Sequence, residues 1–287
     1  MRTLGALAGH ISGTAHKRAT MLRLDLADGS VLAVTDHDET LSFDLGDGAA
    51  SYTPATGILP SDLLLTAGLE ADQMEVTGPV TETGLTTRTA LIGGRFDYAR
   101  ARLFQVNWSD LSQGAAKLLE GEVVLAEVTS GTFKLTIHSQ IARLSRTIGR
   151  VITGYCDADF QDARCGFSEA ATVATVSGVT DARSFTVSYS GTIASDWFNR
   201  GTAQFTSGAL SGTRPVEVFD FAGGAGAGAV ALWIDLPEVP AIGDTLNLKR
   251  GCDKTRTACM AYGNMINFRG FPDVPGSDQV LKYPNPQ

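Results

Sequence analysis

The sequence predicts a mainly β protein with a few short helices and two domains, and three observations support this prediction. Apolar and polar residues alternate in several short segments, as they do in half-buried strands. Glycine accounts for 32 of the 287 residues, which is typical of a chain with many turns. A chain of 287 residues also reaches the length at which one hydrophobic core rarely suffices. We therefore expect β-barrel or β-sandwich domains over residues 1–152 and 153–287.

The first half reads mostly as sheet. Residues 21–44 alternate around Asp28-Gly29, which predicts a β-hairpin with a tight turn. Further strands are predicted over residues 63–76, 101–107, 122–130 and 133–138. The spacing of apolar residues changes from every second residue to a helical period in residues 139–150, where Ile141, Leu144 and Ile148 fall on one helical face. This change predicts a short helix that closes the first domain.

The second half begins with a compact, irregular loop and continues as strands. The predicted strands cover residues 172–179, 184–190, 201–210, 215–221, 230–236 and 244–249. The glycine-rich stretch at residues 221–229 is interpreted as a connection rather than a phosphate-binding loop. It lacks the GxxxxGK[ST] pattern, and no strong helix follows it.

Charge and hydropathy exclude some classes of function. The net charge of −8 and the isoelectric point near 5.0 argue against a protein that grips duplex DNA, which would need a basic face. The N-terminal residues lack the apolar core of a secretory signal, and no apolar run approaches the roughly 20 residues of a membrane span. We expect folding in a reducing cytoplasm, where stable disulfides are unusual.

The sequence shows no catalytic constellation, and we expect no enzymatic activity. His37 lies among Asp36, Asp38 and Glu39, but no second histidine cluster accompanies it, so a solvated strand end is the favoured interpretation. The remaining histidines are scattered, and no Ser/His/Asp or Cys/His pairing is evident.

The four cysteines are the most informative residues. Cys156 and Cys165 form a C-x8-C pair, and Cys252 and Cys259 form a C-x6-C pair. Zinc ligands usually stand two to four residues apart in each pair, whereas these loops are longer and favour a wider [4Fe–4S] cluster. A zinc site remains the alternative, as do buried free thiols or a disulfide. Four basic residues are available to offset the charge of bound thiolates: Arg164, Arg250, Lys254 and Arg256.

The surroundings of these cysteines resemble a known family. CDADFQDARCGF and GCDKTRTACMAYGNMINFRGFPDVPG are similar to the cysteine segments of phage tail-tip proteins of the lambda L type and of the baseplate hub protein of gene transfer agents. In the first half, VLAVTDHDETLSF, YTPATGILPSDLLLTAGLEADQMEVTG and ARARLFQVNWSD resemble the N-terminal signature of that family, in the same order. The resemblance therefore covers nearly the whole chain.

The resemblance implies a structural virion protein, a hub that joins the tail tube and distal tail ring to the tip fibre, or megatron, protein. It implies a homotrimer assembled in the host cytoplasm, a lumen through which DNA passes without specific binding, and a separate tail peptidase. The family's cluster ligands correspond to Cys156, Cys165, Cys252 and Cys259, with Phe268 and Phe271 as candidates for shielding the cluster from water. A small iron–sulfur electron carrier and a tail-associated hydrolase are the competing functions.

Overall fold

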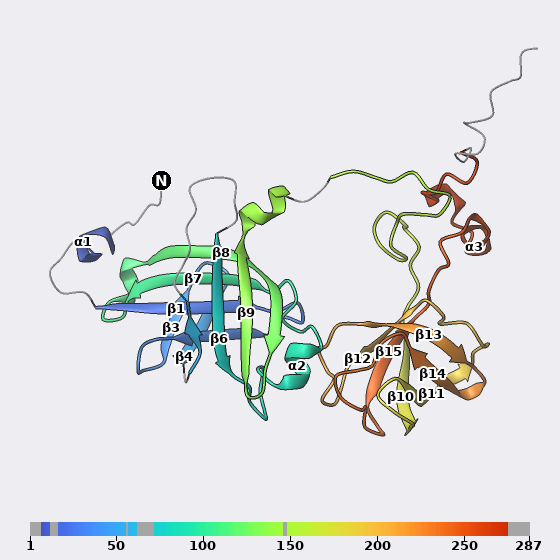
Figure 1. Ribbon diagram of the computed structural model, residues 1–287, viewed down its shortest axis with the longest axis horizontal. Helices are drawn as coiled ribbons and strands as arrows, with labels where there is room; N and C mark the ends of the chain where they lie inside the picture. Colours follow the sequence, from blue (N-terminus) through green and yellow to red (C-terminus); the bar gives the residue numbers. More distant parts are fainter. Residues whose placement is uncertain (1–6, 12–16, 56, 62–71, 146–147, 275–287) are drawn as a thin grey trace, which may run out of the picture. The chain divides into compact units, whose positions relative to one another are not determined.

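The computed structural model describes residues 7–11, 17–55, 57–61, 72–145 and 148–274, and it confirms a mainly β protein. The chain divides into two compact units (Figure 1). The first comprises Met1–Arg146 with Gly212–Arg214, and the second comprises Thr147–Ser211 with Pro215–Gln287. No helix among the described residues is both long enough and apolar enough to cross a membrane.

A nine-stranded, mixed sheet forms the first unit, with its strands in the order β3-β4-β2-β1-β7-β8-β9-β6-β5. The strands are β1 (Arg18–Asp25), β2 (Val31–Thr35), β3 (Leu41–Asp44), β4 (Ala49–Pro54), β5 (Leu59–Pro60), β6 (Gln73–Pro79), β7 (Arg100–Asn107), β8 (Ala115–Val128) and β9 (Thr132–Ser139). The helices are α1 (Leu7–Ile11), α2 (Arg88–Ile92) and the 3₁₀ segments η1 (Leu111–Gln113) and η2 (Gln140–Ser145).

Strands β1 and β7 lie at the centre of this sheet and are buried on both faces. Leu22 and Leu24 of β1 belong to a core on one face, while Met21 packs with Tyr52 and Phe104 in a second core on the other. Arg23 of β1 and Arg102 of β7 are buried with these side chains, whereas Arg18 and Arg100, the first residues of the two strands, are exposed.

The predicted hairpin is confirmed, and the predicted strands over residues 101–107, 122–130 and 133–138 correspond to β7, β8 and β9. Of the predicted strand over residues 63–76, residues 63–71 lie outside the described residues, and the rest belongs to β6.

The predicted helix over residues 139–150 is wrong in type and length. Only the 3₁₀ segment η2 forms, and residues 148–150 are not helical. Leu144 and Ile148 are 74% and 94% exposed and Ile141 is only partly buried, so most of the apolar side of the predicted helix faces solvent. A short α-helix gains most of its stability by packing an apolar face, and this segment buries little of its own.

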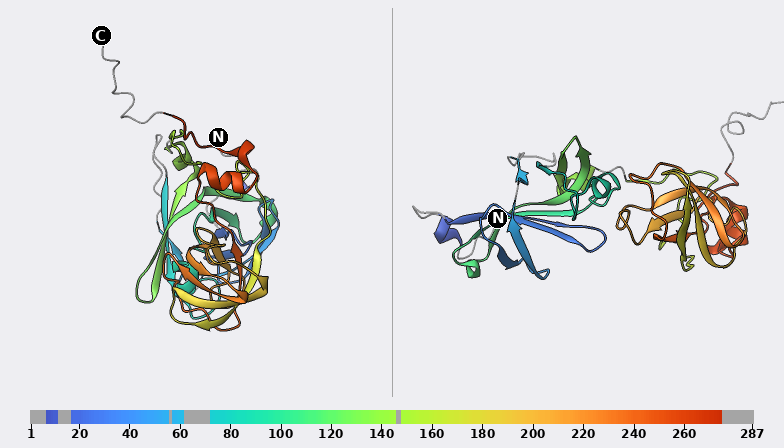
Figure 2. Two further views of the ribbon diagram at one scale, coloured as in Figure 1. Left: turned by 90° about the vertical axis from the view of Figure 1, so that its right-hand side faces the viewer. Right: turned by 90° about the horizontal axis from the view of Figure 1, so that it is seen from below.

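The second unit is built around a closed six-stranded barrel in the order β10-β11-β14-β13-β12-β15 (Figure 2). Its strands are β10 (Thr172–Val179), β11 (Ser184–Thr192), β12 (Thr202–Phe205), β13 (Val216–Ala222), β14 (Ala225–Leu232) and β15 (Thr245–Lys249). The barrel is followed by α3 (Arg256–Ala261) and the 3₁₀ segment η3 (Met265–Asn267). Its interior is filled by buried aromatic and aliphatic side chains, including Phe185, Phe221 and Leu246.

Two predictions in this unit need correction. The strand expected over residues 201–210 is limited to β12, and the glycine-rich stretch is mostly strand β14 rather than a connection. A Cβ atom at Gly228 would lie 2.8 Å from the ring of the buried Phe221 on β13. Glycine is thus required here because an aromatic ring occupies the space of a side chain.

Candidate functional site

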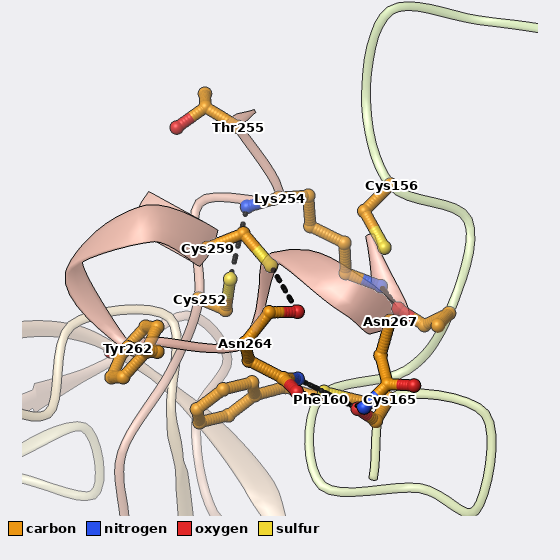
Figure 3. Close-up of a pocket in the computed structure, with 11 residues that line it drawn as sticks. Cys156, Phe160, Cys165, Cys252, Lys254, Thr255, Cys259, Tyr262, Asn264 and Asn267 are labelled. Carbon is orange, nitrogen blue, oxygen red and sulfur yellow. Dashed lines mark hydrogen bonds between the residues drawn. The ribbon is translucent and has the colours of Figure 1, made fainter. Parts of the chain in front are cut away.

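All four cysteines line one pocket in the second unit (Figure 3). Cys156 and Cys165 lie on the loop before the barrel, which we call the first cysteine segment, residues 155–167. Cys252 follows β15, and Cys259 lies on α3; we call residues 251–267 the second cysteine segment. The first segment precedes all the barrel strands in sequence and the second follows them, so the fold brings together two segments that are far apart along the chain. We call the cavity they line the cysteine pocket.

Lys254 and Asn264 connect the two segments. The backbone N–H of Cys156 donates to the carbonyl oxygen of Lys254 at 2.8 Å. The side-chain amide of Asn264 donates to the carbonyl oxygen of Cys165 at 2.7 Å. The thiol of Cys259 donates to the carbonyl oxygen of Asn264 at 3.2 Å. The sulfur of Cys252 accepts the N–H of Lys254 at 3.4 Å, so each of the four cysteines has a hydrogen bond to one of these two residues.

Aromatic residues form one side of the pocket. Phe160 and Tyr262 line it, and Phe167 packs against both at ring-centroid distances of 5.2 and 5.0 Å. The hydroxyl of Tyr262 donates to the carbonyl oxygen of Gly251 at 2.7 Å. These contacts join the two segments through apolar surface and exclude water from that side of the thiols.

The aromatic residues predicted to shield the site lie elsewhere. Phe268 and Phe271 do not line the cysteine pocket. Phe271 is 41% exposed, and its ring lies 5.8 Å from the guanidinium of Arg150. Sequence proximity favoured these two residues, but the second segment turns through η3 before it reaches them.

The environment of the thiols is unfavourable for isolated thiolates. Burial raises the pKa of Cys252, and repulsion from Asp253 and the neighbouring cysteines adds to this effect, while the N–H of Lys254 opposes it. Burial likewise raises the pKa of Cys259, with repulsion from Cys156, Cys252 and Cys165 in the same direction. Thiolates gathered in such a place require a compensating positive centre.

Most of the nearby basic residues are already paired with carboxylates. Hydrogen bonds from Arg164 and Arg150 lower the pKa of Asp157 to about 2. Arg256 pairs with Asp273 at 3.2 Å. Arg250 lies 3.5 Å from Glu169, and its guanidinium also stacks on Trp197 at 3.7 Å and Tyr262 at 4.7 Å. Lys254 is paired as well, with its ammonium nitrogen 3.3 Å from a carboxylate oxygen of Asp159.

The arrangement of the thiols bears on which group would fit. A zinc ion bound by four thiolates, with Zn–S bonds of about 2.3 Å, needs sulfur atoms about 3.8 Å apart. Within the described ranges, no group of three or more His, Cys, Asp or Glu side chains is placed to hold a metal ion. Four thiols nonetheless surround one pocket. Four thiols are the ligand number that either a zinc ion or a [4Fe–4S] cluster takes.

A glycine fixes the start of the second cysteine segment. A Cβ atom at Gly251 would lie 2.1 Å from the backbone carbon of Arg200, and backbone cannot move aside as a flexible side chain can. We expect Gly251→Ala to displace Cys252 and to lower the free energy of unfolding of the second unit by about 2 kcal/mol. Chemical denaturation measures this loss.

Gly154→Ala is the matched control for that substitution, because its nearest contact would be 3.6 Å, an ordinary van der Waals distance. Equal stability of the two variants would show that the close approach at Gly251 does not constrain the chain.

The histidine-containing candidate lies in the first unit. The imidazole of His37 stacks on Trp108 with ring centroids 4.9 Å apart, and only 14% of this side chain is exposed. Its Nδ1 accepts the backbone N–H of Glu39 at 3.0 Å. The expectation of a solvated strand end is therefore wrong for His37, which packs against an aromatic residue, but it holds for Asp38, which is 91% exposed.

Comparisons with known proteins agree with this architecture. Residues 5–168 match the family described as baseplate hub protein, N-terminal attachment domain, and residues 196–278 match the phage conserved hypothetical protein BR0599 family. No curated protein matches the sequence. A chain in a solved structure of the virion of a native gene transfer agent particle is similar over 98% of this chain and 96% of its own, with 30% identity and a TM-score of 0.85. The chain described here belongs to the baseplate hub protein family.

Proposed function

We propose that this protein is a structural hub at the tail tip of a phage or gene transfer agent particle, where it joins the tail tube and distal tail ring to the tip fibre protein. The observation that carries this proposal is the similarity to a chain of a gene transfer agent virion over nearly the entire length of both chains. The family match over residues 5–168 supports the attachment role of the first unit. The role is structural rather than catalytic, and peptidase activity belongs to a separate tail protein.

We also propose that Cys156, Cys165, Cys252 and Cys259 hold one [4Fe–4S] cluster. When bound, the cluster supplies iron–thiolate bonds that link both cysteine segments to one rigid centre. The pocket lined by all four cysteines supports this assignment, and so does the aromatic wall of Phe160 and Tyr262. The chain's own residues position the thiols, exclude water and offset charge.

Anaerobic purification followed by iron, sulfide and zinc analysis tests the cluster. A cubane cluster contains four iron and four sulfide ions, so we expect about four of each per chain. Stoichiometric zinc without sulfide would instead establish a four-cysteine zinc site. Reversible reduction during turnover with a redox partner would favour the electron-carrier function over a structural one.

We further expect a trimer within the tail, because closed symmetry satisfies exposed sheet edges without open polymerisation. The first unit presents β3 and β5 as the edges of its sheet. The measurement is the copy number and symmetry of this chain in a cryo-electron microscopy map of intact tails. A ring of six copies would contradict the three-fold assignment. The same map locates the neighbouring tail proteins and the surface that faces the lumen.

A further inference from the structure

Lys254 joins one cysteine from each segment. Its carbonyl oxygen accepts the N–H of Cys156, and its own N–H donates to the sulfur of Cys252 at 3.4 Å. Its ammonium group crosses to the first segment, where it donates to the carbonyl oxygen of Ala158 at 2.9 Å. The backbone of Lys254 has a φ of 64°, a left-handed conformation that a side chain other than glycine adopts at a cost. The contacts to both segments offset this cost.

Asn264 joins the other two cysteines. Its side-chain amide donates to the carbonyl oxygen of Cys165 at 2.7 Å and lies 3.6 Å from the sulfur of the same residue. Its carbonyl oxygen accepts the thiol of Cys259, and its N–H donates to the carbonyl oxygen of Cys259 at 3.0 Å. Asn267 fixes the orientation of the amide by donating to Oδ1 at 2.8 Å (Figure 3).

These bonds matter because little apolar packing holds the two segments. None of the three hydrophobic core clusters among the described residues includes a member of residues 155–167 or 251–267. The two segments meet through the aromatic contacts of Phe160, Phe167 and Tyr262 and through the polar bonds of Lys254 and Asn264. These polar bonds therefore contribute to the energy that keeps the four thiols together.

We propose that Lys254 and Asn264 are positioning residues that assemble the cysteine pocket before any metal enters it, each pairing one cysteine of the first segment with one of the second. Lys254 pairs Cys156 with Cys252, and Asn264 pairs Cys165 with Cys259. The pairing rests on contacts in the chain itself. A further consequence rests on the proposed function: these residues tune a bound cluster through hydrogen bonds to its ligand sulfurs.

Two substitutions isolate the side-chain contributions. Asn264→Asp keeps the size, the backbone bonds and the Oδ1 acceptor, but it removes the amide donor to Cys165. Lys254→Ala removes the ammonium bonds to Ala158 and Asp159 while the backbone bonds remain. Lys249→Ala is the charge-matched control, since Lys249 is exposed at the end of β15, and Lys254→Arg tests whether a cation at this position restores the wild-type behaviour.

The first readout uses the metal-free, full-length chain under reducing conditions. A short bifunctional thiol reagent cross-links cysteines that lie together, and mass spectrometry identifies the joined peptides. In the wild-type chain we expect cross-links between the two segments, Cys156 to Cys252 and Cys165 to Cys259. Asn264→Asp should lower the second cross-link about fivefold, and Lys254→Ala should lower the first about threefold, as expected for loss of one partly buried hydrogen bond. Lys249→Ala and Lys254→Arg should match the wild type.

Circular dichroism of each variant establishes that the barrel remains folded, so that a lost cross-link reports the pocket alone. Cross-links confined within each segment in the folded wild-type chain would overturn the preassembled pocket, whether or not iron binds. If both Asn264→Asp and Lys254→Ala gave the same cross-link yields as the wild-type chain, the positioning roles would be overturned.

The second readout is the reduction potential of the iron-loaded protein. Asn264→Asp replaces a donor near the sulfur of Cys165 with a negative charge, so the potential should become more negative than in Lys249→Ala. An unchanged potential would overturn the tuning role. A wild-type chain that shows the cross-links but holds no iron or sulfide would remove the cluster and leave the pairing in place.

Discussion

Cys259→Ser is expected to abolish cluster binding and to release the second cysteine segment, while the first unit stays folded. Cys259 lies on the six-residue helix α3, which is too short to be stable alone and contains no buried residue. Because the metal site does not exist in the unfolded chain, the binding free energy of the cluster adds to the stability of the fold. Its loss should lower the unfolding temperature of the second unit by about 10 °C.

Calorimetry and iron analysis measure this effect, and limited proteolysis locates it. We expect cleavage within residues 251–274 of the variant and none in β1 or β7. Ala261→Ser on the same helix is the control, because it adds the same hydroxyl at an exposed position without removing a ligand. Full iron content in Cys259→Ser, or equal proteolysis of both variants, would contradict the assignment of Cys259 as a ligand.

The strands could be predicted from the sequence wherever local pattern and final packing agree. The hairpin of β1 and β2 combines alternation with Asp28-Gly29, where glycine adopts a φ of 84° that the turn requires. The prediction failed where tertiary packing overrides local preference. The glycine-rich start of β14 was missed because glycine has a low strand propensity, whereas its end falls within the strand predicted over residues 230–236. The ring of Phe221 on the neighbouring strand explains why glycine is needed at residue 228.

The sequence pointed to the four cysteines, which the fold places around one pocket, but not to the residues that position them. The cysteine spacings left a cluster, a zinc site and free thiols open, and the family resemblance selected among them. Lys254 was noted only for its charge, and Asn264 was not singled out. Polar residues on irregular loops follow no period, so nothing in the sequence indicated that each would contact a cysteine from a distant segment. Identifying such contacts requires coordinates.

The buried charges of the first unit lead to the second large effect. Arg23 on β1 lies directly opposite Arg102 on β7, and these residues are 7% and 3% exposed. Asp25 accepts from Arg23 at 2.7 Å and from Arg102 at 2.5 Å, and Arg102 also pairs with Asp47. Two like charges opposite each other on one face of a sheet repel, and Asp25 is the carboxylate that they share.

Asp25→Asn should therefore lower the free energy of unfolding of the first unit by about 3 kcal/mol at neutral pH, because it leaves two buried guanidinium groups with less compensating charge. Hydrogen exchange of the β1 and β7 amides, followed by mass spectrometry on the full chain, measures this loss within the first unit. Asp38→Asn is the control, since Asp38 is 91% exposed.

The same interaction predicts a pH dependence. Burial acts to raise the pKa of Asp25, but the hydrogen bonds and charges of Arg23 and Arg102 outweigh it, and the pKa is lowered overall. A carboxylate with a lowered pKa in the folded state stabilises the fold above its ordinary value of about 3.9, and this stabilisation is lost as the pH falls through the lowered value. The wild-type first unit should thus lose stability below about pH 4, whereas Asp25→Asn should lose less over the same range. Parallel losses in the two proteins would show that the acid sensitivity arises from other carboxylates and that Asp25 does not bind the two arginines more tightly in its charged form.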